Sequence, residues 1–475
     1  MKNKLLKNRT LICYSLLFFT MTLFYCILVH LESDYYWHIK AGEVMVKTKS
    51  ILTKDIFSWY VSGRTWVSHE WLFEVIIYYL KMVFGSYHIY IYSFSTIFCL
   101  LVLLFFSKKD DYLKNVSFSL LWSFLSIVIL CYTQVRPQLI SYIFLALTVY
   151  FSYDLYDRKE SRKIYFLPLI ALLWSNIHGG SSNLSYIIPV VFLLAGSFDF
   201  SFKKIYSTRI SNKQIVKYLL VILMCVLAIC INPSGIGMIF YPYQNMMDGF
   251  MLKTISEWQP TNLNDMTHYF YIFIILLLII VFIFSDKRLK LIDFLLFGIS
   301  VFMGFKSIRF WIYTYIIMNF VVFNYISFRK NDKGTNLILI VLSLIVFSAF
   351  VFSIPNIDKV YSKSKIVSDS AISVLKNEKP KRLYNYYDYG GYLLYNNIDV
   401  FIDGRADLYS KYNYKDYYNI SVMSRDYNKL IKKYNFDYFI IPNNLGLNTY
   451  LNSNDNYVRI YHDKNSNIYK YKKTA

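Results

Sequence analysis

Apolar segments long enough to cross a lipid bilayer recur along most of this chain, and they constrain its fold more than any other feature. The first runs from Thr10 to Leu31 and lacks charged residues. Because about 20 apolar residues form a helix that spans the hydrocarbon core, we predict about eleven transmembrane helices. They are expected at residues 10–31, 88–106, 116–133, 138–155, 164–177, 183–199, 215–231, 268–285, 291–305, 310–328 and 336–354. Hydrophobic residues make up 56% of the 475-residue chain, which is typical of multi-pass membrane proteins.

Lysine and arginine residues set the expected orientation of these spans. The most basic loops fall on the same side as the N-terminus, at residues 108–114, 158–163, 203–217, 287–290 and 329–333. Because cytoplasmic loops are enriched in cations, the N-terminus is expected in the cytoplasm of a multi-pass cell-membrane protein. An odd number of spans then places the C-terminal part outside the cell. Much of the net charge of +21 lies in these loops, so nucleic-acid binding is not expected.

One apolar segment, Trp71 to Phe84, is too short for a crossing. Treating it as a span would invert every later loop and place the lysine clusters outside. We therefore predict a helix that lies in the outer membrane interface, anchored by Trp59, Trp66 and Trp71. The first outer loop, residues 32–87, is thus long. We expect residues 1–354 to form a transmembrane domain that includes this loop, and residues 355–475 to form an extracytoplasmic α/β domain.

The expected topology brings the unusual polar residues of the transmembrane domain to the outer face. A random distribution would divide them between the two sides of the membrane. Their convergence predicts a site built from Glu32, Asp34, His38, His69, Glu70, Arg136, Gln138, Asn176, His178, Lys306 and Arg309.

Carboxylates and cations at a membrane surface suit a lipid-borne anionic substrate. Arg136, Lys306 and Arg309 are candidates to hold a phosphate or diphosphate head group. Asp34 is placed to act as general base on an acceptor hydroxyl. A divalent cation is also conceivable near Glu32 and the residues His38, His69 and Glu70, although their spacing matches no known metal signature.

These residues also have a structural interpretation, which the sequence leaves open. Asp34 could be a polar helix end paired with a nearby cation, and Arg136 could contact lipid phosphates alone. His38 and His69 could form hydrogen bonds at the membrane interface. Asn176 and His178 could cap the end of a helix.

From residue 355 onward the chain turns polar and its apolar runs shorten to about five residues. We expect strands at 381–386, 400–403, 436–441, 458–461 and 468–471, and helices at 414–420 and 425–434. Asp403 and Arg405 follow an expected buried strand, where α/β sheets offer room for ligands. They would dock an acceptor or cover the mouth of the helix bundle. Alternatively, they form an internal pair at an Asp-Gly turn.

Short motifs occur along nearly the whole chain, at Asp34–Glu43, Asp55–Ser58, Trp66–Leu72, Arg136–Gln138, Asn176–Gly180, Asn232–Gly235, Tyr389–Leu393 and Phe401–Arg405. Their kind and order resemble a group of bacterial multi-span proteins of the GT-C glycosyltransferase superfamily. This group is related to the dolichyl- and undecaprenyl-phosphate-sugar mannosyl- and arabinosyltransferases.

The resemblance implies an integral-membrane glycosyltransferase, of inverting type, that takes a sugar from a polyprenyl-phosphate donor at the outer face. The expected acceptor is a lipid, a surface glycan or a protein. GT-C enzymes carry an acidic residue just after the first span, which serves as base or metal ligand. Asp34 matches that position, and Glu32 would be a second carboxylate for Mg²⁺ or Mn²⁺, the only cofactor expected. Ser33 separates the two acids, so the paired-acid motif is interrupted.

Two functions of other classes are compatible with the same sequence. One is a lipid-linked glycan flippase or transporter, which would need polar groups through the depth of the membrane. The spans offer few, since Asp154 and Asp293 lie close to span ends. The other is a non-catalytic cell-envelope assembly protein whose outer domain binds glycan.

Overall fold

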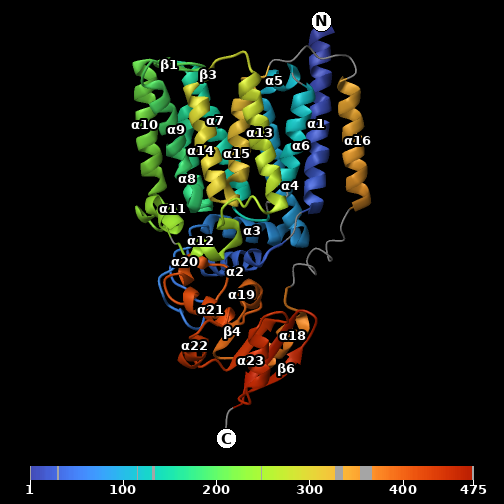
Figure 1. Cartoon of the computed structure of the whole chain (residues 1–475), viewed down its shortest axis with the longest axis vertical. Helices are drawn as coiled ribbons and strands as arrows, with labels where there is room; N and C mark the ends of the chain where they lie inside the picture. Colours follow the sequence, from blue (N-terminus) through green and yellow to red (C-terminus); the bar gives the residue numbers. More distant parts are fainter. Residues whose placement is uncertain are drawn as a thin grey trace. The chain divides into compact units, whose positions relative to one another are not determined.

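The computed structural model describes residues 2–28, 31–114, 116–130, 134–247, 249–326, 335–353 and 366–472, drawn in colour in Figure 1. Two compact units are present. Unit 1 comprises Met1–Val29 and Ile89–Ile354, and unit 2 comprises His30–His88 and Pro355–Ala475. The sequence analysis assigned the loop 32–87 to the transmembrane domain, whereas the structure groups it with the C-terminal residues. The physical reason is a set of hydrogen bonds and a buried ion pair that join the two stretches of unit 2.

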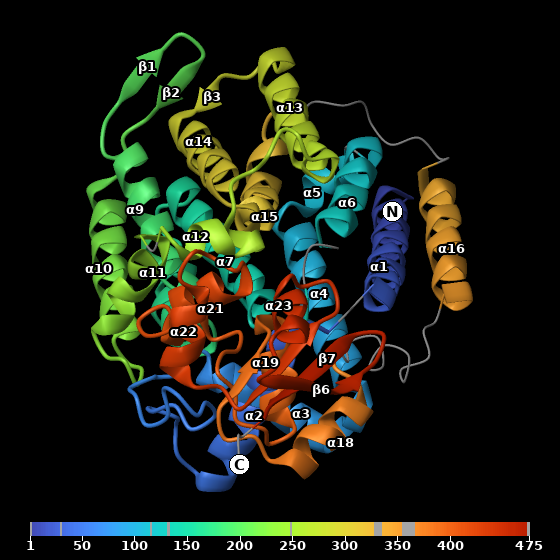
Figure 2. The ribbon, with the colours of Figure 1, turned by 60° about the horizontal axis from the view of Figure 1, so that its bottom comes forward.

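Unit 1 is a bundle of apolar helices (Figures 1 and 2). Helix α1 packs against α16, α10 packs against α8 and α9, and α7 contacts both α9 and α15. The helices are α1 (Lys2–Leu28), α4 (His88–Ser107), α5 (Lys109–Lys114), α6 (Val116–Leu130), α7 (Gln138–Asp157), α8 (Leu167–Ile177), α9 (Leu184–Gly196), α10 (Asn212–Ile229), α11 (Gly237–Met247), α12 (Met251–Thr254), α13 (Tyr269–Phe284), α14 (Leu291–Lys306), α15 (Trp311–Val322) and α16 (Thr335–Ser353).

Within the part of the chain that the structure describes, 5 helices are long and apolar enough to cross a membrane. They are Trp71–Ser107, Gln138–Asp157, Gly179–Gly196, Asn212–Ile229 and Met266–Phe284. Shorter apolar helices cover Leu11–Cys26, Lys163–Ile177, Ile308–Val322 and Leu337–Ala349. These helices are those of a membrane protein. The total of about eleven spans and the interfacial position of residues 71–84 stay predictions.

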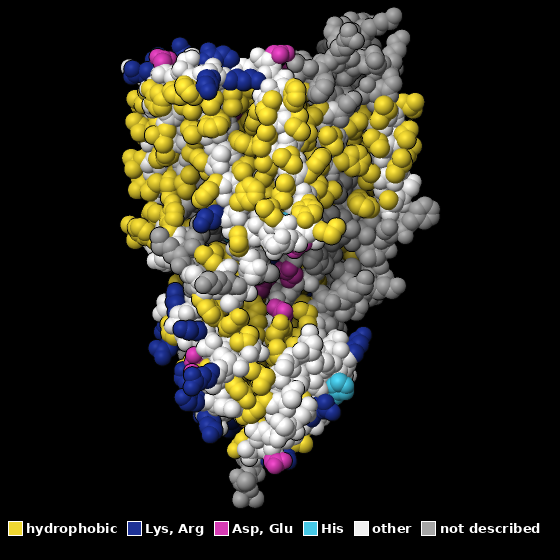
Figure 3. All heavy atoms as spheres, viewed as in Figure 1, with side chains coloured by type: hydrophobic (Ala, Val, Ile, Leu, Met, Phe, Trp, Pro, Cys, Tyr) yellow, Lys and Arg dark blue, Asp and Glu magenta, His cyan; other side chains and the backbone are white. Residues whose placement is uncertain are grey.

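The outward faces of the unit 1 helices are hydrophobic (Figure 3). On α10, Leu219, Leu223 and Leu227 are 53%, 56% and 58% exposed. They recur every four residues and therefore form one stripe along the helix. An apolar stripe of this length is unfavourable in water and is satisfied by lipid chains. The surface of unit 1 thus supports membrane insertion.

Cations gather at the end of unit 1 that carries a three-stranded sheet (Figure 3). The sheet has the order β1 (Phe200–Phe202), β2 (Ile205–Ser207) and β3 (Leu289–Lys290). In the loop between β1 and β2, Lys204 Nζ donates to the carbonyl oxygens of Phe282 and Ile283, at 3.0 and 3.1 Å. A cation is favourable here because the last carbonyls of α13 are unsatisfied and carry the negative end of its dipole. The predicted basic loop at 329–333 lies outside the described residues.

Unit 2 contains a four-stranded sheet in the order β4 (Leu383–Asn385), β5 (Tyr438–Pro442), β7 (Ser466–Tyr471) and β6 (Tyr457–His462). Strands β4 and β5 are parallel, with Tyr384 opposite Phe439, and the other two pairs are antiparallel. Its C-terminal helices are α18 (Asp369–Glu378), α19 (Tyr387–Tyr395), α20 (Ala406–Tyr409), α21 (Tyr414–Ser421), α22 (Tyr427–Tyr434) and α23 (Leu447–Ser453).

The strand expected at 400–403 was wrong beyond its first residue. Val400 forms an isolated parallel bridge with Ser58, and no strand follows among the described residues there. Side-chain amides take the place of a neighbouring strand. Asn385 Oδ1 accepts from the Phe401 backbone N–H at 2.8 Å, and Asn413 Nδ2 donates to the Phe401 carbonyl at 2.9 Å.

The N-terminal stretch of unit 2 forms α2 (Ser33–Thr48) and α3 (Trp71–Phe84), which pack against each other. Helix α2 also packs against α19. Glycines permit the close backbone approach that both contacts require. A methyl group at Gly42 would lie 2.1 Å from the Glu74 carbonyl oxygen, and one at Gly391 would lie 2.1 Å from the Ser33 carbonyl oxygen. The Gly-Gly pair of the sequence therefore brings α19 onto the first turn of α2.

Candidate functional site

Asp34 lies in the first turn of α2, where the helix dipole favours a carboxylate. Its side chain is half-buried and lies against the backbone of Gly404. A methyl group at Gly404 would lie 1.8 Å from Asp34 Oδ1 and 3.0 Å from Trp37 Nε1. A larger residue at position 404 would therefore displace the Asp34 carboxylate. The Asp-Gly-Arg turn of the C-terminal residues thus borders the acid that follows the first apolar segment.

The indole of Trp37 contributes a hydrogen-bond donor beside Asp34. Trp37 is 5% exposed, and its Nε1–H has no hydrogen-bond partner among the described residues. A buried N–H without an acceptor costs about 1–3 kcal/mol, which a bound oxygen atom would offset. A carboxylate that accepts and an indole that donates together suit a hydroxyl group, which does both.

Arg405 forms a buried ion-pair network, which corresponds to the structural interpretation left open by the sequence. Its Nε and Nη2 donate to the two oxygens of Asp403 at 2.8 and 2.6 Å, and its Nη1 donates to Asp55 Oδ1 at 2.6 Å. Tyr409 donates to Asp403 Oδ2 at 2.6 Å. Asp403 and Asp55 are 0% exposed and Arg405 is 1% exposed. The guanidinium therefore holds the loop together through both carboxylates.

Two histidines of the predicted site, His38 and His69, lie among carboxylates. His38 is buried, with Nε2 3.6 Å from Glu70 Oε2 and Nδ1 3.4 Å from Glu74 Oε1. His69 Nε2 lies 3.5 Å from Glu70 Oε1, and its Nδ1 lies 3.9 Å from Asp407 Oδ2. Burial alone would lower the pKa of His69, but the negative charges of Glu70 and then Asp407 raise it above its ordinary value.

The His69→Gln variant tests this electrostatic coupling. Because the folded pKa of His69 is raised, its charged form stabilises the fold fully below about pH 6.5, its ordinary pKa, and less as the pH rises above that value. We expect the wild type to unfold at a higher temperature than His69→Gln in mild acid, with the difference shrinking as the pH increases. Thermal unfolding of both proteins across neutral pH measures this. A difference that grows in alkaline solution would contradict the assignment.

The predicted divalent-cation site finds no support in the side-chain geometry. Glu32 precedes α2 and its side chain does not cap the helix. Across the described ranges, no three His, Cys, Asp or Glu side chains are grouped so that they could hold a metal ion. Binding of Mg²⁺ or Mn²⁺ by Asp34 and Glu32 therefore stays a prediction, and no step below depends on it.

Unit 1 has its own charged cluster, in which two arginines contact one carboxylate. Arg136 Nη1 donates to both oxygens of Glu257, at 3.1 and 2.9 Å, and Arg309 Nη1 lies 3.5 Å from Glu257 Oε1. Burial would raise the pKa of Glu257, but Arg136 and Arg309 lower it below its ordinary value. The two guanidinium groups thus converge on a single anionic group.

His178 extends this cluster toward α7. Its Nδ1 lies 2.7 Å from Ser141 Oγ and 2.8 Å from Ser181 Oγ, and its Nε2 lies 3.4 Å from Nη2 of Arg309. Because a guanidinium only donates, Nε2 must accept, and we assign the proton of a neutral imidazole to Nδ1. The structure thereby brings together Arg136, His178 and Arg309, three of the residues predicted from sequence.

The other predicted residues of unit 1 do not join this network. Asn176 Nδ2 donates to the carbonyls of Leu172 and Ile231, at 2.8 and 2.9 Å, which is the helix-capping role considered above. Gln138 begins α7 and is buried. Lys306 ends α14 with its ammonium 5.9 Å from the centre of the Phe302 ring, and it forms no ion pair among the described residues.

Sequence reasoning missed two members of these clusters. Ser141 and Glu74 sit inside apolar helical segments, and no local pattern distinguishes them from ordinary core positions.

No protein-family model and no curated protein matches the chain. Among solved structures, the chain is similar to the Archaeoglobus fulgidus oligosaccharyltransferase tethered through a disulfide bond to an acceptor peptide containing the NVT sequon. The TM-score is 0.52 at 10% identity, over 90% of this chain and 69% of that one. The apo form of the same enzyme gives a TM-score of 0.45 at 11% identity, over 87% and 66% of the chains. The first similarity confirms the GT-C fold expected from the sequence.

Proposed function

We propose that this protein is a glycosyltransferase of the GT-C type that transfers a sugar from a polyprenyl-phosphate donor to an acceptor hydroxyl at the outer face of the cell membrane. The acceptor belongs to a lipid, a surface glycan or a protein. The observation that carries the proposal is the fold, shared with an oligosaccharyltransferase over 90% of the chain. Fold alone does not determine chemistry, so the proposal also depends on the clusters around Asp34 and Arg136.

Asp34 is the proposed general base. In an inverting transfer the acceptor oxygen forms a bond to the anomeric carbon while the bond from that carbon to the phosphate oxygen breaks. The acceptor proton passes to the Asp34 carboxylate, and the polyprenyl phosphate leaves with the electron pair. Support comes from the fixed position of the carboxylate against Gly404 and from the Trp37 indole N–H beside it.

Arg136 and Arg309 are the proposed donor-phosphate ligands. Their side chains already converge on the Glu257 carboxylate, which has a charge and oxygen geometry comparable to those of a phosphate. Guanidinium groups bind such oxygens through paired N–H donors and stay charged at all physiological pH values. Lys306 is retained as a third predicted cation.

The proposal is tested with the purified full-length protein in lipid nanodiscs and a series of radiolabelled polyprenyl-phosphate hexoses. We expect release of polyprenyl phosphate together with sugar bound to an acceptor. The double variant Arg136→Gln/Arg309→Gln should raise KM for the donor by about tenfold or more. Arg158→Gln is the matched control, because its side chain is 76% exposed.

Two outcomes would contradict the proposal. Donor binding without any cleavage would favour the non-catalytic assembly protein. Movement of intact donor lipid across a liposome membrane, again without cleavage, would favour the flippase.

A further inference from the structure

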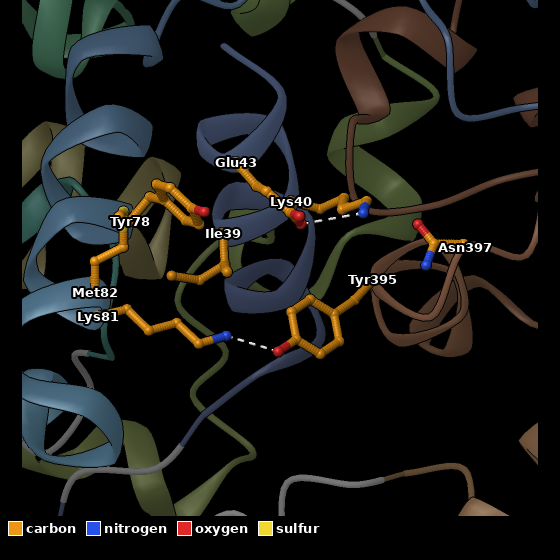
Figure 4. Close-up of a pocket in the computed structure, with 8 residues that line it drawn as sticks. All are labelled: Ile39, Lys40, Glu43, Tyr78, Lys81, Met82, Tyr395 and Asn397. Atoms are coloured by element: carbon orange, nitrogen blue, oxygen red, sulfur yellow. Dashed lines mark hydrogen bonds and ion pairs between the residues drawn. The ribbon is translucent and has the colours of Figure 1, made fainter. Parts of the chain in front are cut away.

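A pocket of about 430 Å³ lies in unit 2, on a face of α2 remote from Asp34. Side chains from α2, α3 and α19 converge on it (Figure 4). Its lining includes Lys40 and Glu43 of α2, Lys81 of α3 and Tyr395 of α19. Glu43 follows Asp34 by nine positions, so at about 100° per residue the two point to opposite sides of the helix. The pocket is therefore separate from the proposed reaction centre.

The pocket carries a net positive charge. Lys81 Nζ donates to the Tyr395 hydroxyl at 2.6 Å and lies 4.6 Å from the centre of that ring. Lys40 Nζ lies 3.1 Å from a Glu43 oxygen, and Lys47 pairs with the other oxygen of the same carboxylate. The lining of the pocket thus holds two ammonium groups and one carboxylate, and Lys47 offsets part of the charge of that carboxylate from outside the lining. Each ammonium has three N–H donors, so donors remain for an anionic ligand.

The last turns of α3, next to Lys81, expose large hydrophobic side chains. Val83 and Met82 are 71% and 61% exposed, and Met82 also lines the pocket. The patch consists of Tyr79, Met82, Val83, Phe84 and Tyr87. A contiguous exposed apolar patch of this kind marks contact with an apolar partner. Lysines beside exposed aromatic and aliphatic groups fit a lipid interface, with ammonium groups at phosphate level and apolar groups among acyl chains.

We propose that this pocket binds the head group of an anionic phospholipid. The ammonium groups of Lys40 and Lys81 hold the phosphate, and the acyl chains lie along the exposed apolar patch of α3. A volume of about 430 Å³ is within the range that accommodates small organic ligands. The phosphate could belong to a lipid head group or be a free phosphate ion. The apolar patch favours the lipid, because a free phosphate ion would form no favourable contact with it.

The test uses purified full-length protein in neutral detergent with phosphatidylglycerol added in steps, and bound lipid is counted by native mass spectrometry. Replacing both lysines in Lys40→Gln/Lys81→Gln should weaken phosphatidylglycerol binding about 30-fold, given the contribution of each lysine at an anionic lipid surface. Lys81→Arg keeps the charge and should retain binding. Lys429→Gln/Lys432→Gln on α22 removes equal charge from exposed positions of the same unit and should change nothing.

Other results of this experiment would contradict the proposed binding of an anionic phospholipid. Wild-type affinity in Lys40→Gln/Lys81→Gln, with an unchanged unfolding temperature, would overturn the proposal. Equal retention of zwitterionic phosphatidylcholine would also overturn it. Inorganic phosphate that displaces the lipid at equal concentration would point to a free-phosphate site instead. Val83→Asn should weaken lipid binding and leave competition by phosphate unaltered, and no effect on the lipid would count against the acyl-chain contact.

Discussion

Asp34→Asn should lower the rate of sugar transfer by about 10²- to 10⁴-fold, the usual contribution of a general base. An amide has nearly the shape of the carboxylate but cannot take the acceptor proton. Because Asp34 lies against Gly404 through its oxygen, the isosteric change leaves that packing in place. Donor binding and the unfolding temperature should therefore be close to those of the wild type. Single-turnover transfer from a labelled polyprenyl-phosphate sugar measures the chemical step itself.

Asp426→Asn serves as the control for this experiment. Its side chain is 63% exposed at the start of α22, so the same chemical change should leave transfer unaffected. Wild-type transfer by Asp34→Asn would remove the residue from its proposed role. A loss of transfer with a lowered unfolding temperature would instead identify Asp34 as a structural residue.

Arg405→Ala should destabilise unit 2 by about 3–5 kcal/mol, the cost of leaving a buried charge without its partner. The substitution strips both Asp403 and Asp55 of their guanidinium contacts, and both carboxylates are 0% exposed. It also removes the cation that stacks 4.7 Å above the Trp66 ring. For a unit of this size the expected fall in unfolding temperature is about 6–20 °C. Fluorescence-monitored thermal unfolding in detergent detects such a shift.

Arg425→Ala is the matched control, since that arginine is exposed in the same unit. Arg405→Lys should recover little of the loss, because one ammonium cannot reach both carboxylates in the forked geometry of a guanidinium. An unfolding temperature within 1–2 °C of wild type for Arg405→Ala, on the order of measurement error for this size, would show that the network contributes little.

Local patterns predicted much of the fold. The apolar segments gave the helices of unit 1, and the order of motifs anticipated the GT-C fold that the structural comparison confirms. The composition of unit 2 was also informative, since α21 and α22 form within one or two residues of the expected helices. These features arise from interactions between residues near one another in the chain, which a periodicity analysis can detect.

Long-range contacts account for what the sequence did not reveal. Asp55 and Arg405 are 350 positions apart, and no local pattern pairs them. Because the sequence does not reveal that ion pair, the sequence analysis assigned the loop 32–87 to the transmembrane domain. No local pattern pairs Arg136 with Glu257 either, because the two are 121 positions apart.

Unit 2 is assembled from two stretches separated by most of the chain, 30–88 and 355–475, and this has a consequence for biogenesis. During translation Asp55 is synthesised long before Arg405. Its carboxylate therefore lacks the Arg405 guanidinium while the intervening helices are synthesised. Asp34 likewise acquires its glycine neighbour only near the end of translation. A nascent polypeptide that stalls among the helices therefore lacks both of these contacts. Unit 2 becomes complete only after the last segment has been synthesised.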